Sequence, residues 1–362
     1  MPALPGGTLM LVAAIAAALL ALAWALRLPR RVLATMLALL WLAALSAHLV
    51  LPEGAGLRRA IGGSAAGWFA LGLAVAAVLA YRGGLARLRA RVAAAPDPAS
   101  DRPAGAFSSA ELDRYARHIV LRELGGPGQR KLKAARVLVI GAGGLGSPAL
   151  LYLAAAGVGT IGIVDDDTVS NSNLQRQVIH RDADIGRPKV ASAAREMTAL
   201  NPHVTVIAHP IRLEADSAAR LCADYDLVLD GTDNFATRLL VNAACVAARK
   251  PLISAAITQW EGQISLYDPA AGAPCYACIF PQEPAEGLAP SCAVAGVVGA
   301  LPGVVGAMMA LEAVKELGGV TASGAGLSLR GRMMLYDALW GENRTIAIRR
   351  RPDCPTCGGL HG

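Results

Sequence analysis

The chain has 362 residues, of which 54% are hydrophobic, 17% are charged and 4% are aromatic. This composition excludes an intrinsically disordered chain, and it is more apolar than is usual for a water-soluble enzyme of this length. The formal net charge of +7 comes from the first hundred residues, because the later residues carry equal numbers of acidic and basic side chains. A neutral later region argues against a nucleic-acid partner, since nucleic-acid binding generally needs a basic face.

Three stretches near the N-terminus, about 8–26, 32–51 and 60–81, contain no Asp, Glu, Lys or Arg. A helix needs roughly 20 apolar residues to cross a bilayer, so each stretch predicts a transmembrane helix. A cleaved signal peptide is the alternative for the first stretch, but it lacks a basic segment before it and two more stretches follow. Arginines are most numerous after the first and third stretches, which places everything after residue 82 on the cytoplasmic side.

Residues 1–92 are therefore predicted to form a multi-pass anchor in the inner, cytoplasmic membrane. Residues 93–106 read AAAPDPASDRPAGA, and their Pro and Gly content predicts a linker. The linker would hold a second domain, residues 107–362, beside the bilayer. That domain begins with Ser108 and Glu111 at the spacing of a helix-capping box.

A glycine-rich turn follows the short β-rich run 136–140 and precedes a helical stretch. A second strand, 160–164, ends at Asp165, roughly 20 residues beyond the glycines, as dinucleotide sites require. Glycines let the backbone approach phosphates, whose charge is favoured at a helix N-terminus. The glycines of this turn are Gly141, Gly143, Gly144 and Gly146.

Later strand-like runs alternate with helical segments. This alternation predicts an α/β, Rossmann-like fold with a mostly parallel sheet and helices on both faces. A glycine turn of this kind alone would first indicate a nicotinamide or flavin enzyme, and that alternative stays open. The later runs are 204–208, 227–230 and 252–255.

Polar residues that follow successive strands indicate the chemistry. Asp165 is predicted to bind a ribose, Arg176 and Lys189 phosphate oxygens, and Asp233 a magnesium ion. In doubly wound folds ligands bind beyond the carboxyl ends of the strands, where these residues lie. Two cations and a carboxylate that converge on a phosphate suit phosphoryl or nucleotidyl transfer, because the charge of the transition state must be stabilised.

The stretch from Arg114 to Cys357 resembles the MoeB/ThiF/HesA family of adenylyltransferases, bacterial relatives of ubiquitin-activating enzymes, and most of all its molybdopterin-synthase adenylyltransferase branch. The resemblance implies that ATP, with magnesium, adenylates the C-terminal glycine carboxylate of a small ubiquitin-like sulfur carrier protein that ends in Gly-Gly. The acyl adenylate would later become a thiocarboxylate for molybdopterin cofactor biosynthesis. The matching motifs are RYARHIVLRELG, GAGGLGSP, VDDDTVSNSNLQRQVIH, GRPKVASA, LVLDGTDN, PLISAAITQWEGQISLY, two CxxC pairs and MMLYDA.

The same resemblance implies the binding residues and the assembly. Arg117 matches an arginine that reaches into the neighbouring subunit's site in this family, so a homodimer is implied. The catalytic set would be Arg117, Arg176, Lys189 and Asp233, with Cys292 in relatives a candidate for a thioester or acyl-disulfide. The nucleotide would contact Gly141, Gly143, Gly144, Gly146, Asp165, Ser172, Asn173, Leu174, Gln175, Arg176, Lys189, Asp233 and Asn234.

Two CxxC pairs, Cys275 with Cys278 and Cys354 with Cys357, predict a structural zinc site if the fold brings them together. A redox role is the alternative, but it needs one such pair at a helix start, and two make it less favoured. Cys292 follows a loop rich in proline and acidic residues, and a simple loop thiol is as well supported there as a reactive one. The remaining cysteines, Cys222 and Cys245, lie in apolar helical patterns and are predicted to be core.

Residues 293–311 form another uncharged run, which is predicted to be a buried turn and helix because glycines and the family match run through it. The chain stops five residues after Cys357 without a rhodanese-like domain, so a separate sulfur donor protein is expected. Four other functions stay open. They are activation of a thiamine-pathway carrier, a tRNA threonylcarbamoyladenosine dehydratase-like activity, a nicotinamide-dependent oxidoreductase and a non-catalytic membrane scaffold.

Overall fold

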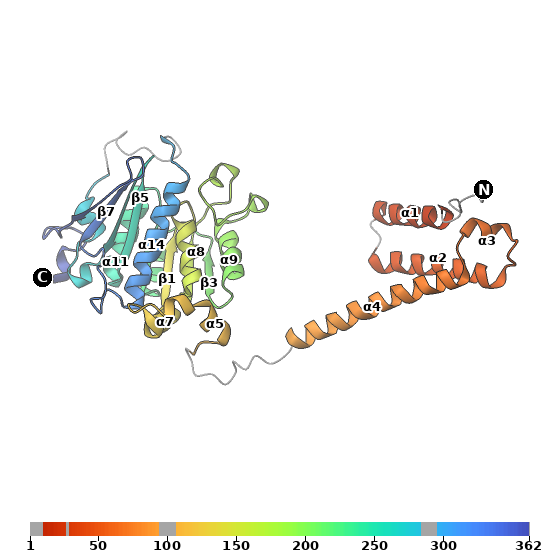
Figure 1. Ribbon diagram of the computed structural model, residues 1–362. Helices are drawn as coiled ribbons and strands as arrows, with labels where there is room; N and C mark the ends of the chain where they lie inside the picture. Colours follow the sequence, from red (N-terminus) through yellow and green to blue (C-terminus); the bar gives the residue numbers. More distant parts are fainter. Residues whose placement is uncertain (1–9, 27–28, 94–105, 284–294, 362) are drawn as a thin grey trace. The chain divides into compact units, whose positions relative to one another are not determined.

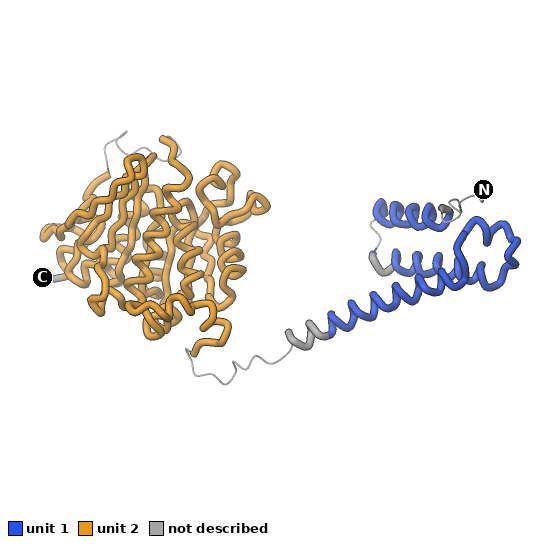
Figure 2. Tube along the Cα trace, in the orientation of Figure 1, with its two compact units in different colours: residues 1–101 blue, residues 102–362 orange. Residues whose placement is uncertain are grey.

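The computed structural model describes residues 10–26, 29–93, 106–283 and 295–361. These residues form two compact units, residues 1–101 and 102–362, drawn in blue and orange in Figure 2. Each unit has its own hydrophobic core.

The first unit is helical. Within the described residues, two stretches are long and apolar enough to cross a membrane, 32–50 and 65–87. The apolar part of the first helix, Leu11–Ala25, is shorter, so the prediction of three membrane-spanning helices is not supported. The helices are α1 (Met10–Ala25), α2 (Arg30–Val50), α3 (Gly56–Ile61) and α4 (Ala65–Ala93).

The third predicted span differs from the observed helix at both ends. Gly62 and Gly63 adopt positive φ angles of 69° and 82°, which end α3 and separate it from α4. The indole nitrogen of Trp68 donates to the carbonyl of Gly62 (3.0 Å) and fixes this break. α4 then continues past the expected end at Tyr81, through the arginine-rich segment, as far as Ala93.

The second unit contains one eight-stranded sheet in the order β3-β2-β1-β4-β5-β6-β7-β8. The first five strands in this order are parallel, and β6, β7 and β8 are added as antiparallel strands. The prediction of an α/β fold with a mostly parallel sheet is therefore confirmed, whereas the antiparallel extension was not predicted. The strands are β1 (Arg136–Ile140), β2 (Thr160–Val164), β3 (Thr205–His209), β4 (Leu227–Asp230), β5 (Leu252–Ile257), β6 (Glu261–Tyr267), β7 (Arg332–Asp337) and β8 (Glu342–Ala347).

Helices cover both faces of the sheet (Figure 1). Along β1, Val137 and Val139 pack with the side chains of α8 (Gly146–Ala156) and α14 (Ala300–Gly318). Leu138 and Ile140 point the other way, because successive strand residues alternate between faces. They pack with side chains of α10 (Ala215–Ala223) and α11 (Phe235–Ala248). The other helices are α5 (Ser109–Arg114), α6 (Ala116–Ile119), α7 (Gly125–Ala134), α9 (Lys189–Leu200), α10 (Ala215–Ala223), α11 (Phe235–Ala248) and α12 (Tyr276–Ile279).

Three local predictions are confirmed. Ser108 and Glu111 form the expected capping box, with Ser108 Oγ 3.1 Å from the amide of Glu111. The described part of the uncharged run 293–311 enters α14, which lies in the core of this unit. Cys222 and Cys245 are both buried core residues.

Candidate active site

The glycine turn lies between β1 and α8, at the carboxyl edge of the parallel strands. Gly141 has a φ of 93°, which favours glycine. A Cβ on Gly146 would lie 1.8 Å from the carbonyl oxygen of Gly141, so the chain folds back on itself too closely for any side chain there. The turn therefore presents backbone rather than side chains in front of the N-terminus of α8, an arrangement that fits an anion.

Asp165, the residue after β2, faces this turn as predicted. Its carboxylate accepts hydrogen bonds from the amides of Ala142 (2.7 Å) and Asp167 (2.9 Å). Burial raises the pKa of Asp165, and the positive charge of Lys189 opposes that rise. The side chain of Lys189 is 5% exposed, and its Nζ lies 2.7 Å from a carboxylate oxygen of Asp167. The structure thus brings Asp165 and Lys189 together beside the turn.

Arg176 lies on another side of the turn. Its guanidinium donates to the carbonyl of Ser172 (3.2 Å) and to the side-chain oxygen of Asn173 (3.1 Å). A Cβ on Gly144 would lie 3.7 Å from Cγ of Arg176 and 3.1 Å from Cβ of Pro302, at the start of α14. The absence of a side chain at Gly144 therefore lets Arg176 and the start of α14 pack closely against the turn.

Residues beside Arg176 lie close to two other glycines, Gly299 and Gly143. Leu174 and Gln175 continue the chain from the short turn that contains Asn173, and the carbonyl oxygen of Gln175 would lie 2.5 Å from a Cβ on Gly299. The side-chain amide nitrogen (Nε2) of Gln177 would lie 3.7 Å from a Cβ on Gly143. The side-chain oxygen of Gln177 is buried and has no hydrogen-bond partner among the described residues. A buried polar atom without a partner beside a glycine cradle fits a polar ligand.

The loop after β4 completes the edge. Asp230 is fully buried and accepts from the amide (3.0 Å) and hydroxyl (2.7 Å) of Thr232 and from the hydroxyl of Ser254 (3.0 Å). Asp233 is exposed, which leaves its carboxylate accessible to a cation. The side-chain oxygen of Asn234 accepts from the amide of Thr237 (2.8 Å) and caps α11, so this atom has a structural role.

The structure does not place two of the predicted residues at this edge: one lies elsewhere, and the other is not described. Arg117 is exposed on α6, and no described contact joins it to the glycine turn. Cys292 lies outside the described residues. The described carboxylates that lie within 4.8 Å of one another as a group are Asp165, Asp166 and Asp167, and Asp233 is not among them.

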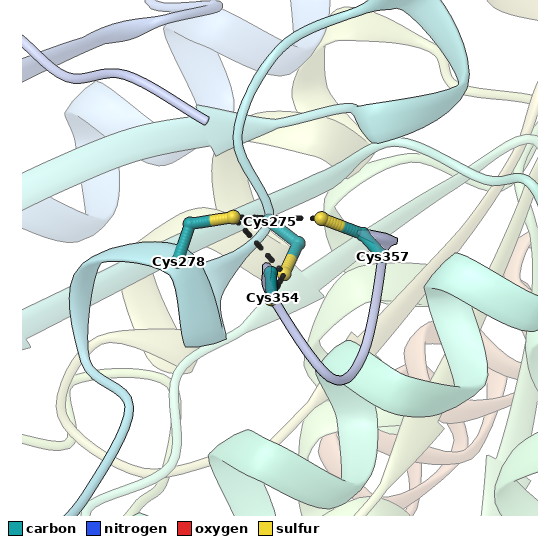
Figure 3. Close-up of side chains that lie close together, drawn as sticks. All are labelled: Cys275, Cys278, Cys354 and Cys357. Carbon is teal, nitrogen blue, oxygen red and sulfur yellow. Dashed lines mark hydrogen bonds between the residues drawn. The ribbon is translucent and has the colours of Figure 1, made fainter. Parts of the chain in front are cut away.

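The two CxxC pairs meet in space, as the zinc prediction requires. Their sulfur atoms point toward one another (Figure 3), at distances of 3.8 Å for Cys275 and Cys278, 3.7 Å for Cys275 and Cys354, and 3.4 Å for Cys278 and Cys357. Zinc–sulfur bonds of about 2.3 Å place tetrahedral sulfur ligands about 3.8 Å apart. Burial raises the pKa of the Cys275 and Cys278 thiols, so a cation would be needed to hold them as thiolates. The four cysteines could therefore hold zinc.

Sequence reasoning did not single out two residues at the edge of the sheet. Asp167 pairs with Lys189, and the run of three aspartates after β2 was the available signal. Asp230 holds the loop that bears Asp233, and its signal was an acid at the end of an otherwise apolar strand. Both act through contacts that only the folded chain shows.

Curated relatives match the second unit at high identity. A sulfur carrier protein adenylyltransferase of Thermus thermophilus is 48% identical over 256 residues, 70% of this chain and 93% of that protein. The probable adenylyltransferase/sulfurtransferase MoeZ of Mycobacterium tuberculosis is 51% identical over 70% of this chain. Mouse adenylyltransferase and sulfurtransferase MOCS3 is 47% identical over 76% of it. The matches span 64% of MoeZ and 61% of MOCS3, less than two thirds of either.

Solved structures agree on the fold. Escherichia coli MccB crystallised with ATP superposes with a TM-score of 0.58 over 68% of this chain and 75% of that chain, at 24% identity. MccB with MccA-N7isoASN gives a TM-score of 0.59 over 68% and 75%, also at 24% identity. The family model described as the ThiF family matches residues 115–356, well over half of the chain. As the resemblance over Arg114–Cys357 implies, the chain belongs to the ThiF family.

Proposed function

We propose that this chain uses ATP and magnesium to adenylate the C-terminal carboxylate of a small ubiquitin-like sulfur carrier protein that ends in Gly-Gly. The observation that carries the proposal is the 48% identity with a sulfur carrier protein adenylyltransferase, over 93% of that relative. The arrangement of Asp165, Arg176 and Lys189 around the glycine turn supports it, because all three lie where a nucleotide would be bound.

In the proposed reaction, an oxygen of the carrier's terminal carboxylate attacks the α-phosphorus of ATP. A bond forms between the carboxylate oxygen and the α-phosphorus. The bond from the α-phosphorus to the oxygen that bridges to the β-phosphorus breaks, and pyrophosphate leaves with the bonding electrons. No general base is required, because the carboxylate is already ionised at neutral pH. Two anions must approach each other, so the site has to supply positive charge and alignment.

Arg176 and Lys189 would supply that charge. Lys189 would exchange its contact with Asp167 for a phosphate oxygen, and the side chain of Arg176 lies beside Gly144 of the turn. Asp233 is exposed at the end of β4 and would hold magnesium, which neutralises phosphate charge when bound. Asp165 would accept from a ribose hydroxyl while it keeps its backbone hydrogen bonds.

A groove beside this edge would receive the carrier's tail. It runs over the ends of β5 to β8 and is lined by Ile257, Gly262, Leu335, Tyr336 and Arg344, among others. β4 and β5 are adjacent in the sheet, so the groove lies next to the strand that bears the Asp230–Asn234 loop. An extended tail without side chains at its last two residues could pass from the groove to the phosphates.

The remaining features extend the proposal. The apolar stretches 32–50 and 65–87 support a membrane anchor that would keep the second unit at the cytoplasmic face of the inner membrane. Arg117 would act in the partner's site of a homodimer, a separate protein would donate sulfur, and no nucleic acid would be bound. Cys292 remains a candidate for a covalent carrier intermediate. We assign the carrier to molybdopterin cofactor biosynthesis, with a thiamine-pathway carrier as the alternative.

The test combines the full chain in detergent micelles with ATP, magnesium and purified carriers of both pathways, followed by intact-mass spectrometry. The expected product is one AMP on a carrier with an intact Gly-Gly end, and none on the same carrier without its last glycine. Arg176→Ala should lower the rate by about 10²-fold or more, whereas Arg220→Ala, an exposed arginine on α10, should leave it unchanged. Tight NAD binding without AMP transfer to any carrier would contradict the proposal.

A further inference from the structure

A series of hydrogen-bonded side chains ends on the backbone of the glycine turn, and the proposed reaction does not use it. Arg195 donates to both carboxylate oxygens of Asp184, with Nη1 2.7 Å from Oδ1. The hydroxyl of Ser192 lies 2.9 Å from Oδ2 of Asp184 and 3.0 Å from Nδ1 of His180. Nε2 of His180 lies 3.0 Å from the carbonyl oxygen of Ala142, between two glycines of the turn.

The series is shielded from water. Asp184 and Ser192 are 1% exposed and His180 is 6% exposed. Groups buried to this degree must satisfy their hydrogen bonds within the protein. The partners each side chain has here are therefore the ones that determine where its protons lie.

The carbonyl oxygen of Ala142 can only accept, so Nε2 of His180 must carry a proton. Nδ1 faces the hydroxyl oxygen of Ser192, whose single proton is donated to the carboxylate of Asp184. Burial lowers the pKa of His180, and the positive charge of Lys189 lowers it further. The hydrogen bond to Ala142 and the negative charges of Asp165 and Asp184 oppose this lowering. The proton on Nε2 is the one this contact requires, because a bare Nε2 would aim a lone pair at the carbonyl oxygen of Ala142.

This contact sets the direction of a backbone amide. In a trans peptide the carbonyl and the following N–H point in opposite directions. Because His180 holds the carbonyl of Ala142, the N–H of Gly143 in the same peptide group points away from His180. Among the described residues, that amide donates to no backbone acceptor. The amide of Ala142 itself is held by Asp165, so the peptide groups on both sides of Ala142 are fixed.

We propose that His180, held in place by its contacts with Ser192 and with the carbonyl of Ala142, is a positioning residue that aims the amide of Gly143 at a phosphate of bound ATP. The inference rests on the proposed function for the presence of ATP. It predicts that losing the contact between His180 and Ala142 weakens nucleotide binding without affecting recognition of the carrier.

The test measures the dissociation constant of labelled ATP by equilibrium dialysis of the full chain in detergent micelles, and KM for the carrier in AMP transfer. His180→Leu removes the donor, and His180→Gln keeps an amide N–H near the position of Nε2. Ser192→Ala removes the group that contacts Nδ1 of His180 and is the milder change should His180→Leu not fold. Ser265→Ala is the matched control, because that buried hydroxyl donates to the carbonyl of Arg332 (2.8 Å) on another part of the sheet.

We expect His180→Leu and Ser192→Ala to weaken ATP binding roughly three- to tenfold, with KM for the carrier unchanged. His180→Gln and Ser265→Ala should stay within about twofold of the wild type. The inference is overturned if His180→Leu and Ser192→Ala bind ATP like the wild type, or if His180→Gln is as weak as His180→Leu. A wild type that binds ATP but adenylates no carrier would instead contradict the proposed function alone. A wild type that does not bind ATP would overturn both.

Discussion

Replacing Gly146 by alanine should disrupt the glycine turn more than any other single-methyl change in it. The added Cβ would lie 1.8 Å from the carbonyl oxygen of Gly141 and 2.9 Å from its carbonyl carbon, whereas ordinary contact begins at 3.4 Å. The obstacle is backbone at the end of β1, so it cannot rotate aside as a flexible side chain would. Either the turn or the first turn of α8 must move.

The magnitude follows from two opposing effects. Overpacking a well-filled region costs typically about 1–3 kcal/mol, and the rigid obstacle places this site at the upper end. Alanine is favoured over glycine inside a helix by about 1 kcal/mol, which offsets part of that cost. We therefore expect Gly146→Ala to lower the free energy of unfolding of the second unit by about 2 kcal/mol. ATP binding should weaken as well, since the turn carries the amides that would face the phosphates.

Hydrogen exchange of the full chain, read by mass spectrometry on peptides that cover β1 and β4, measures the effect within the second unit alone. Gly303→Ala in α14 is the control, because a Cβ there meets nothing within 4 Å. That variant should keep or increase the protection by up to about 1 kcal/mol. Unchanged protection of β1 together with unchanged ATP affinity in Gly146→Ala would refute the reasoning.

Three further outcomes are expected. Elemental analysis should find one zinc per wild-type chain and a loss of it in Cys354→Ser, while Cys222→Ser keeps the metal; equal metal in both variants would exclude the four-cysteine site. The hydrogen bond from Arg195 lowers the pKa of Asp184 from its ordinary 3.8 to about 2. The ionised carboxylate of Asp184 therefore stabilises the fold above pH 3.8, and this stabilisation is lost as the pH falls from 3.8 to about 2. Acid titration of unfolding should therefore show a smaller loss of stability between these values in Asp184→Asn, and identical titrations would contradict the assignment. Alkaline extraction should leave the full chain in the membrane pellet and release a chain that lacks residues 1–92; release of both would argue against the anchor.

Much of the parallel sheet could be predicted from the sequence. The runs 136–140, 160–164 and 227–230 coincide with β1, β2 and β4, because each is a short apolar run bounded by turn residues or an acid. The positions of Asp165, Arg176 and Lys189 near the turn also followed from the rule that parallel strands end at one edge.

The remaining features depend on contacts between residues far apart in the chain. β6 pairs antiparallel with β5, β7 with β6 and β8 with β7, and no spacing in their sequences indicates that register. Gly62 and Gly63 separate α4 from the helix before it, and the lack of charged residues in this stretch gives no sign of the break. The contact of His180 with Ala142 joins residues 38 positions apart, and no spacing rule indicates it.

Isotope exchange between labelled pyrophosphate and ATP tests the central claim most directly, because it reports reversible attack on the α-phosphorus without any later sulfur chemistry. The account predicts exchange that requires magnesium and a carrier with a free Gly-Gly carboxylate, and that disappears when the carrier's last glycine is removed or when Arg176 or Lys189 is replaced by alanine. Exchange that persists without a carrier, or its absence with every Gly-Gly carrier although ATP binds, would contradict it.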